Sequence, residues 1–440
     1  MTMHELGLVE AVRAIRAGRI DPFAYAAALH DRARRLDPAI RAFTVLAEPV
    51  PSEVSPPGGS LGGIPVAVKD IIATRDLPTA NGSPIDEGRV PAADAWVVSR
   101  LRDLGASVLG KTVTTEFAWR QPGPTHNPWA RGHTPGGSSS GSAAAVAAGL
   151  APLALGSQTY GSVIRPAAFC GVVGFKPSFG AIPRVGVHPL APSLDHVGVF
   201  TRSVEDAAYA LALLAGTSEA DLHGQPLPPL SYDPEAGLDA GPAPRLGLLR
   251  IGPWDAAEPA AHACLETAAA RFRDAGGRVE PLDLPERFAG IAQAARTILA
   301  CEAAAIFGPV IAAHPGQASA HLKDLVREGE GIPATAYIAA RRLQDELRRD
   351  FAAALQGFDA VLTLPAPGPA PEGLDNTGDP SFCVPFSFLG VPCLTLPAGE
   401  ATGRPLGLQL VAPYRNDGRL LRIARWCESV LDRPIRFPAL

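Results

Sequence analysis

Two short serine-containing segments decide the fold and the chemistry expected of this 440-residue chain. Residues 136–142 read Gly-Gly-Ser-Ser-Ser-Gly-Ser, and residues 156–162 read Gly-Ser-Gln-Thr-Tyr-Gly-Ser. The alanine-rich residues 143–148 lie between them and favour a helix. Two serine loops separated by one helix suggest a nucleophile and a helper residue for covalent catalysis.

A lysine is the general base that the sequence offers to such a nucleophile. No histidine lies within several residues of Ser162, so a Ser-His-Asp triad has no local support. Lys69 closes an apolar run, residues 62–69, that is typical of a buried strand. Burial disfavours a charged lysine, and lowering its pKa from about 10.4 to near 7 corresponds to roughly 4 to 5 kcal/mol. Taken alone, Lys69 also fits a surface lysine at a strand end; the two serine loops favour a base.

The segments around these motifs alternate between helices and strands. Residues 48–63 are rich in Pro, Gly and Ser, and they predict a surface loop before the Lys69 strand. A short strand is predicted over residues 107–109. Capping residues and helical spacing predict helices over residues 3–18, 21–36, 94–104 and 203–216. This alternation indicates an α/β sheet.

A second group of strands is predicted near the C-terminus, over residues 359–364, 393–397 and 406–411. Residues 217–244 are proline-rich and are predicted to loop out, and residues 256–356 have a mostly helical pattern. Because the helical region offers no partner strands, we expect the late strands to join the first sheet. The prediction is a single domain over residues 1–440, with a core at about 60–215 and about 359–432 and a mostly helical peripheral region at about 217–356.

Composition excludes several classes of protein. A hydrophobic content of 47% with 19% charged residues is typical of a soluble globular protein. The net charge of −5 is spread without a basic block, so we expect no nucleic-acid partner and no membrane. The N-terminus lacks the apolar core of a secretory signal, which predicts a cytoplasmic protein. Six cysteines without metal-binding spacing, and the loosely placed His126 and His133, predict no metal and no cofactor.

Together these segments resemble the amidase signature family of serine amidohydrolases. The similarity is densest over residues 135–149 and 153–177, which end in Pro-Ala-Ala-Phe-Cys-Gly-Val-Val-Gly-Phe-Lys-Pro. The resemblance implies a large mixed β-sheet covered on both faces by helices. It also implies a Ser-Ser-Lys triad, in which Lys69 is the base, Ser138 bridges the proton and follows a cis peptide bond, and Ser162 is the nucleophile.

The turn before Ser162 is expected to supply the oxyanion hole through backbone N–H groups of Thr159, Tyr160, Gly161 and Ser162. The family usually has glycine at the position of Tyr160. A tyrosine there is strained if the position requires a positive φ; otherwise its ring projects into the substrate pocket, and we favour the second interpretation. In the first loop, Ser139 and Ser140 are expected to hydrogen-bond the loop or cap the following helix.

Arg165 lies three residues after Ser162, a spacing that resembles malonamidase-type members, which also share Gln158 and the triple serine. The resemblance makes Arg165 a candidate ligand for a substrate carboxylate, because a guanidinium group can bind a carboxylate through two hydrogen bonds. A buried structural ion pair is the alternative. Gln158 and Tyr160 are further substrate-binding candidates. For Asp195, stabilisation of a turn beside the site is the alternative to a functional role.

Other interpretations of single residues are weaker. The Gly/Ser loop lacks the lysine and spacing of a phosphate-binding P-loop. Ser139 formally matches a G-x-S-x-G nucleophile elbow, but no apolar strand precedes it. Cys170 lies in an apolar setting, which favours an inert packed thiol over a nucleophile.

The expected function is a cofactor-independent amidase that hydrolyses a small carboxylic amide, with or without a carboxylate, through an acyl-enzyme. A small-molecule amide is the expected partner, and the resemblance makes a homodimer the expected assembly. The alternative is a glutaminase-type subunit of a tRNA-dependent amidotransferase complex, which belongs to the same family; Arg165, Gln158 and the lack of a basic face argue against it. A binding protein on a decayed amidase scaffold is a third possibility.

Overall fold

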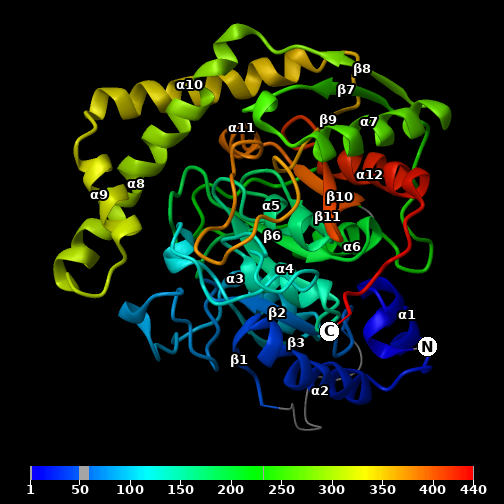
Figure 1. The fold of residues 1–440 in the computed structure, drawn as a ribbon. Helices are drawn as coiled ribbons and strands as arrows, with labels where there is room; N and C mark the ends of the chain where they lie inside the picture. Colours follow the sequence, from blue (N-terminus) through cyan, green and yellow to red (C-terminus); the bar gives the residue numbers. More distant parts are fainter. Residues whose placement is uncertain (1, 49–58, 231, 440) are drawn as a thin grey trace.

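The computed structural model describes residues 2–48, 59–230 and 232–439 (Figure 1). Most of the predicted loop at 48–63, namely residues 49–58, lies outside the described residues. The core is one mixed eleven-stranded sheet, in the order β1-β3-β2-β4-β6-β5-β10-β11-β9-β7-β8. The strands are β1 (Phe43–Leu46), β2 (Pro65–Lys69), β3 (Ser107–Thr112), β4 (Leu153–Gln158), β5 (Val173–Lys176), β6 (His196–Thr201), β7 (Arg245–Leu249), β8 (Arg278–Leu282), β9 (Ala360–Thr363), β10 (Cys393–Ala401) and β11 (Arg404–Val411).

Helices cover both faces of this sheet, which confirms the predicted α/β architecture. In the described part of the chain they are α1 (Leu8–Arg16), α2 (Pro22–Ile40), α3 (Trp96–Asp103), α4 (Ser140–Ala147), α5 (Ile164–Cys170), α6 (Val204–Leu214), α7 (Pro259–Asp274), α8 (Ile291–Ala313), α9 (Ala320–Glu330), α10 (Ala334–Ala354), α11 (Val384–Phe388) and α12 (Asp417–Leu431).

The two faces of the central strands carry side chains of different size. In β2, Val66 and Val68 belong to the larger apolar core, whereas Ala67 points to the opposite core with α4 and α5. In β4, Ala154 joins that second core as well. Since side chains alternate between faces along a strand, small residues at every second position leave room for α4 and α5 to lie close to the sheet. This close packing brings both serine segments against the ends of β2 and β4.

The C-terminal strands join the sheet in its middle. β10 pairs with β5 through Cys393–Lys176 and Leu394–Phe175, and β11 lies between β10 and β9. Residues far apart in the chain therefore share one sheet, as the need for strand partners predicts. β7 and β8 extend the sheet further, although β8 lies within residues predicted as mostly helical. β8 has only two fully buried residues, and such a short edge strand has too little periodicity to be recognised.

The helices α8, α9 and α10 lie side by side at one edge of the molecule, coloured green to yellow in Figure 1. Residues 286–313 form a helical stretch that is long and apolar enough to cross a membrane by length and composition alone. Within its most apolar window, 44% of the residues are buried, and α8 packs against α9, α10 and α11. An interior helix of a helical region passes the same test of length and composition.

Two helical glycines test how tightly α8 and α9 are packed. A Cβ atom on Gly329 of α9 would lie 1.9 Å from the backbone oxygen of Ala300 in α8. Gly329→Ala is therefore expected to lower the free energy of unfolding by more than about 1 kcal/mol, since a backbone atom has to move. Gly308→Ala is the control, because the nearest atom there is a glutamate side-chain oxygen at 3.9 Å. That variant should be neutral or stabilised by up to about 1 kcal/mol, as alanine favours helix. Equal effects of both variants in chemical denaturation would contradict the packing.

Candidate active site

A cavity of about 410 Å³ brings the two serine segments together. Ser138 of the first loop and the second turn, Thr159 to Ser162, both line it. The neighbouring strands β2 and β4 are parallel, and they end at Lys69 and Gln158 beside this cavity. The carboxyl ends of parallel strands are a common location for active sites in α/β folds.

Lys69 is completely buried beneath the cavity. Its Nζ donates hydrogen bonds to Ser138 Oγ at 2.7 Å and to Ser157 Oγ at 2.8 Å. Burial lowers the pKa of Lys69 well below the usual lysine value, and the nearby Asp195 carboxylate opposes this effect. The surface-lysine interpretation is therefore excluded, and Lys69 lies where a neutral amine can exchange a proton with Ser138.

Ser157 is a contact of Lys69 that the sequence reasoning missed. It belongs to β4 and lies one residue before Gln158. The signal was its place in the second serine segment, five residues before Ser162. Its hydroxyl gives the lysine a second polar partner, so the amine keeps a defined position without an acidic partner in direct contact.

The first serine loop is held in place from several sides. The peptide bond between Gly137 and Ser138 is cis, as the resemblance implies. The Gly137 carbonyl accepts a hydrogen bond from Arg165 Nη2 at 2.8 Å, and the Ser138 carbonyl accepts one from the Thr115 amide at 3.2 Å. Gly136 has φ +82 and lies so close to Pro166 that a Cβ would be 2.7 Å from its Cα. Only glycine fits at this position.

The two remaining serines of that loop hold it to its surroundings. Ser139 Oγ donates to the backbone oxygen of Ser157 and accepts from the Ser157 amide. Ser140 Oγ donates to the Gly136 carbonyl at 2.9 Å. Both contacts fit the predicted supporting role, since neither hydroxyl is directed at Ser162 in the described contacts.

Ser162 lies at the floor of the cavity and is 8% exposed. Its hydroxyl and that of Ser138 line the same space, but no hydrogen bond joins them among the described residues. The backbone N–H groups of Thr159, Tyr160, Gly161 and Ser162 donate to no protein acceptor in the described part of the chain. Four unpaired donors in one turn beside a serine hydroxyl form a site where negative charge on an oxygen can be stabilised.

Gln158 does not reach the cavity. It is fully buried, its Oε1 accepts from the amides of Val163 and Ile164, and its Nε2 donates to Ser387 Oγ. Ser387 Oγ in turn donates to the Tyr160 carbonyl at 2.6 Å. With every polar atom engaged by the protein, Gln158 has no group left to bind substrate. Its contacts shape the turn around Ser162 instead.

Tyr160 lines the cavity, and its backbone is not in the positive-φ region. The strained alternative therefore does not occur. Its ring meets the edge of the Trp119 ring with centroids 6.3 Å apart. The tyrosine hydroxyl is buried and has no hydrogen-bond partner among the described residues. Burial raises the pKa of this hydroxyl, so it stays neutral.

Arg165 lines the same cavity, and only one of its three guanidinium nitrogens binds the protein in the described part of the chain. Nη2 binds the Gly137 carbonyl and Thr377 Oγ1, whereas Nε and Nη1 are buried without a partner among the described residues. Burial lowers the pKa of Arg165 to about 10, which leaves it cationic at neutral pH. No acidic side chain pairs with it among the described ion pairs, so the structural ion-pair alternative is not what the contacts show. A buried cation with unpaired N–H groups favours an anionic ligand.

Asp195 supports the turn and acts on Lys69 through its charge. Its carboxylate accepts from Thr159 Oγ1 at 2.6 Å and from the amides of Leu190 and Ala191. Burial raises the pKa of Asp195 to about 6, so the group is ionised above this pH. The turn-stabilising interpretation is correct, and the charge beside Lys69 adds to it.

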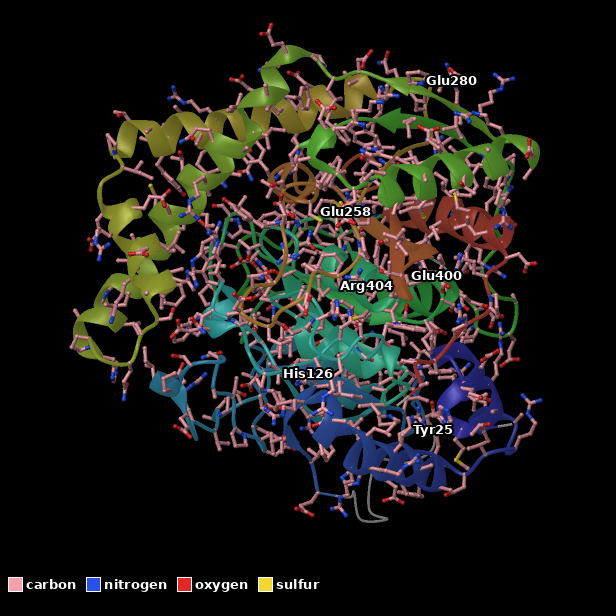
Figure 2. The ribbon with its side chains drawn as sticks, viewed as in Figure 1. Tyr25, His126, Glu258, Glu280, Glu400 and Arg404 are labelled. Carbon is pink, nitrogen blue, oxygen red and sulfur yellow. The ribbon has the colours of Figure 1, made fainter. Side chains whose placement is uncertain are left out.

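The remaining candidates lie away from this cavity. Cys170 is buried, its pKa is raised by burial, and its Sγ contacts the Pro135 carbonyl at 3.4 Å. His126, labelled in Figure 2, accepts a hydrogen bond from the Gly132 amide at its Nδ1. Within residues 2–48, 59–230 and 232–439, no group of three or more His, Cys, Asp or Glu side chains is arranged to hold a metal ion.

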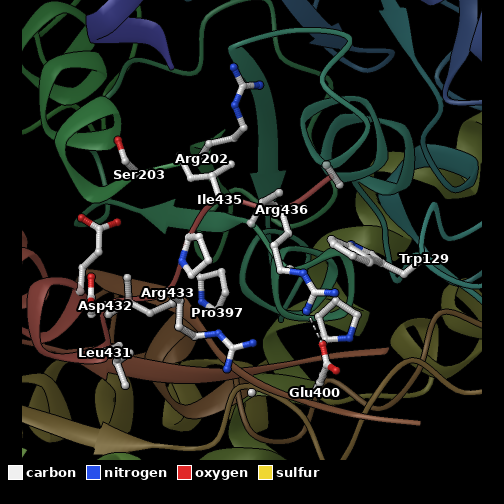
Figure 3. Close-up of a pocket in the computed structure, with 18 of the residues that line it drawn as sticks. Trp129, Arg202, Ser203, Pro397, Glu400, Leu431, Asp432, Arg433, Ile435 and Arg436 are labelled. Carbon is white, nitrogen blue, oxygen red and sulfur yellow. Dashed lines mark hydrogen bonds and ion pairs between the residues drawn. The ribbon is translucent and has the colours of Figure 1, made fainter. Parts of the chain in front are cut away.

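A second cavity, of about 460 Å³, lies beside the C-terminal segment (Figure 3). Trp129, Arg202 and residues 431–436 line it, and Arg436 pairs with Glu400 at 2.8 Å across it. None of the predicted catalytic residues lies there. The smaller cavity therefore holds the candidate active site, because it alone contains the serines together with the unpaired turn amides.

The fold and this arrangement define a hydrolase that acts on the carbon–nitrogen bond of amides. The chain belongs to the amidase family, whose profile matches residues 46–421.

Three relatives narrow the comparison, and all three are the same subunit of a glutamyl-tRNA(Gln) amidotransferase. The chain is 37% identical over 464 residues to the subunit from Thermus thermophilus, with 97% of this chain and 98% of the relative covered. The one from Rhodopirellula baltica is 35% identical over 460 residues, with 92% of each chain covered. The crystal structure of the one from Thermotoga maritima has a TM-score of 0.85 at 27% identity and covers 100% of this chain and 99% of that one.

These relatives correct two expectations. The main functional prediction, a small-molecule amidase, is wrong, because relatives matched over nearly the whole chain are subunits of a glutamyl-tRNA(Gln) amidotransferase. The predicted partners, a small-molecule amide without nucleic acid, are contradicted by the same finding. A net charge of −5 on one chain does not exclude nucleic acid from an assembly, since other subunits can carry the basic surface. Gln158 is no evidence against the amidotransferase alternative, because its side chain binds the Val163 and Ile164 amides instead of a substrate. The sequence does not show this orientation.

The electrostatics of Lys69 can be measured directly. We expect Lys69 to titrate well below the usual lysine range, because burial disfavours its charge. In Asp195→Asn the pKa of Lys69 should be lower still, because the variant lacks a carboxylate that favours the charged amine. The difference is expected above about pH 6, where Asp195 is ionised. The chain contains four lysines, so NMR of ¹³C-labelled lysine gives few resonances, and Lys69→Met assigns the one of interest. An unchanged or raised Lys69 pKa in Asp195→Asn would contradict this account.

Proposed function

We propose that the chain is the glutaminase-type subunit of a tRNA-dependent amidotransferase complex, in which it releases ammonia from glutamine. The name shared by the relatives supports this proposal. The observation that carries it is the charge pattern of the cavity, which is lined by the cations Arg165 and Arg120 and by the carboxylates of Asp375 and Asp379; Arg165 has no acidic partner among the described residues. An amino-acid amide offers a carboxylate and an ammonium group to match these charges.

The proposed chemistry begins at Ser162. Its Oγ attacks the side-chain amide carbon of glutamine while its proton passes through Ser138 Oγ to neutral Lys69. The carbonyl oxygen becomes an oxyanion and is stabilised by the unpaired N–H groups of residues 159–162. The carbon–nitrogen bond then breaks, the proton returns to the leaving nitrogen, and ammonia departs. Water hydrolyses the resulting ester, releases glutamate and regenerates Ser162.

Substrate recognition is assigned to Arg165 and Tyr160. We place the α-carboxylate of glutamine against the free Nε and Nη1 of Arg165, where it satisfies donors that have no protein partner. The finer resemblance to malonamidase-type members rests on this arginine and on Gln158, and the relatives do not support that assignment. The arginine keeps its role as a carboxylate ligand in the proposal, and Gln158 becomes a residue that shapes the turn.

The proposal extends to the setting of the chain. Residues 1–440 form a single amidase domain, with a core at about 60–215 and 359–432. The chain works in the cytoplasm beside partner subunits, which carry the surface that holds tRNA. A homodimer is not part of this proposal. Because the chain lacks a basic block, we expect weak binding of isolated tRNA to the purified chain.

The nucleophile is tested in the assembled complex, purified with its partner subunits. Ser162→Ala should lower glutamine-dependent conversion of glutamyl-tRNA(Gln) at least about 10³-fold, because the ester can no longer form. The same variant should still support conversion when an ammonium salt replaces glutamine. Cys170→Ala is the control and should retain most of the glutamine-dependent rate. Full glutamine-dependent activity of Ser162→Ala would overturn the proposal. A wild-type chain that hydrolyses amides but supports no conversion of glutamyl-tRNA(Gln) in the complex would overturn it as well.

The role of Arg165 is tested by comparing two amides. Arg165→Ala should raise KM for glutamine at least about tenfold, because the buried carboxylate site is lost. Butyramide has no carboxylate, and its kcat/KM should change much less. Arg165→Lys keeps the charge but not the planar guanidinium group, so its KM for glutamine should lie between the values of the wild type and Arg165→Ala. Equal losses on both amides would mean that Arg165 acts only by holding the Gly137 carbonyl.

A further inference from the structure

The wall of the cavity contains an aromatic pair that is held from outside the site. Trp119 and Tyr160 both line the cavity, and their rings meet edge to face. Trp119 is only 8% exposed. Tyr160 is part of the oxyanion turn, residues 159–162, so its ring lines the cavity close to Ser162.

Trp119 lies between two guanidinium groups. Arg120 and Arg296 each lie 5.2 Å from its ring centroid, a distance at which cation–π attraction is effective. The indole N–H donates to the backbone oxygen of His321 at 3.1 Å. Arg296 belongs to α8 and His321 to α9, so the peripheral helices hold the ring from two directions.

The helices that hold Trp119 are themselves joined. Arg296 Nε donates to Glu328 Oε1 at 2.8 Å, and its Nη2 contacts Glu328 Oε2, which gives a two-point contact between α8 and α9. The close approach of Gly329 to Ala300 fixes the same helices. These two contacts join α8 and α9, the helices that contribute Arg296 and His321 to the surroundings of Trp119.

The backbone N–H of Tyr160 belongs to the proposed oxyanion hole. Its carbonyl accepts from Ser387 Oγ, and its hydroxyl is buried without a partner among the described residues. Apart from this N–H group, the ring is the part of Tyr160 that lines the cavity and can meet a ligand. Its effect on binding is therefore steric and apolar, unlike the charge recognition assigned to Arg165.

We propose that the Trp119–Tyr160 pair, held by Arg296 and α9, is the specificity-determining wall that admits amides with an unsubstituted nitrogen and excludes bulky N-substituents. The inference deepens the proposed function, because glutamine is a short primary amide, and it rests on that function only for the identity of the natural substrate.

The test compares a primary amide with its anilide in two series. The first pair is glutamine and γ-glutamyl-p-nitroanilide, and the second is butyramide and butyryl-p-nitroanilide. Wild-type enzyme in its complex should prefer the primary amide at least about 100-fold in kcat/KM in both series. Tyr160→Ala should reduce this preference at least about tenfold. Tyr160→Phe is the matched control: it removes the hydroxyl, which lies near the Arg296 guanidinium, but keeps the ring, so it should keep the preference.

A variant outside the cavity guards against a general loss of folding. Arg296→Gln removes a guanidinium that contacts Trp119 and lies near the Tyr160 hydroxyl, and it should reduce the preference about two- to fivefold while the primary-amide rate stays nearly constant. A merely structural effect would lower both rates and leave their ratio unchanged. If the ratio of kcat/KM for the primary amide to that for the anilide is unchanged in both Tyr160→Ala and Arg296→Gln, the proposed role of the aromatic wall is wrong.

The two proposals fail in different ways. If the enzyme turns over the butyramide pair with the expected preference but not glutamine, the wall stands and the glutaminase proposal falls. If it turns over glutamine but Tyr160→Ala leaves the ratio unchanged, the glutaminase proposal stands and the wall falls. Preference for the anilide in the wild type would overturn the wall directly.

Discussion

The site depends on one buried amine. Lys69 has no exposed surface, and no acidic side chain among the described residues is in direct contact with it, so neither water nor an ion pair stabilises its charge. Burial alone does not define the position of the amine. Hydrogen bonds to the hydroxyls of Ser138, in the first serine loop, and Ser157, in β4, define it. The neighbouring Asp195 moderates the loss of charge. The sheet, the first serine loop and α4 all serve to keep this environment closed.

Small residues make that closure possible. Ala67 and Ala154 let α4 and α5 approach the sheet, and a Cβ on Gly141 of α4 would lie 2.0 Å from the Ala42 carbonyl. Gly136 also lies close to Pro166 at the start of the first loop. In contrast, the other face of the same strands carries valine and leucine and supplies most of the apolar burial. One face thus provides stability, and the other provides close contact at the site.

The helical region at the edge of the molecule has a part in the site that its position in the sequence does not suggest. Arg296 and His321 lie more than a hundred residues after Ser162, yet both contact the Trp119 side chain beside it. His321 also lines the cavity, whereas Arg296 contacts Trp119 without lining it. A family resemblance concentrated in residues 135–177 cannot show this, because α8 and α9 have no motif of their own.

Sequence alone determined the α/β class and the return of the late strands to the sheet, since these depend on local patterns and on the need for strand partners. The grouping of Lys69, Ser138 and Ser162 came from the family resemblance of the motifs that contain them. Only the tertiary structure decided where side chains point. Gln158 faces backbone amides, Arg165 keeps two free donors, and Ser157 contacts the lysine, all of which depend on the packing of segments distant in the chain. The functional prediction failed for the same physical reason: residue types near a nucleophile indicate chemistry, whereas the substrate and the partner are selected by the shape and charge of a surface built from the whole chain.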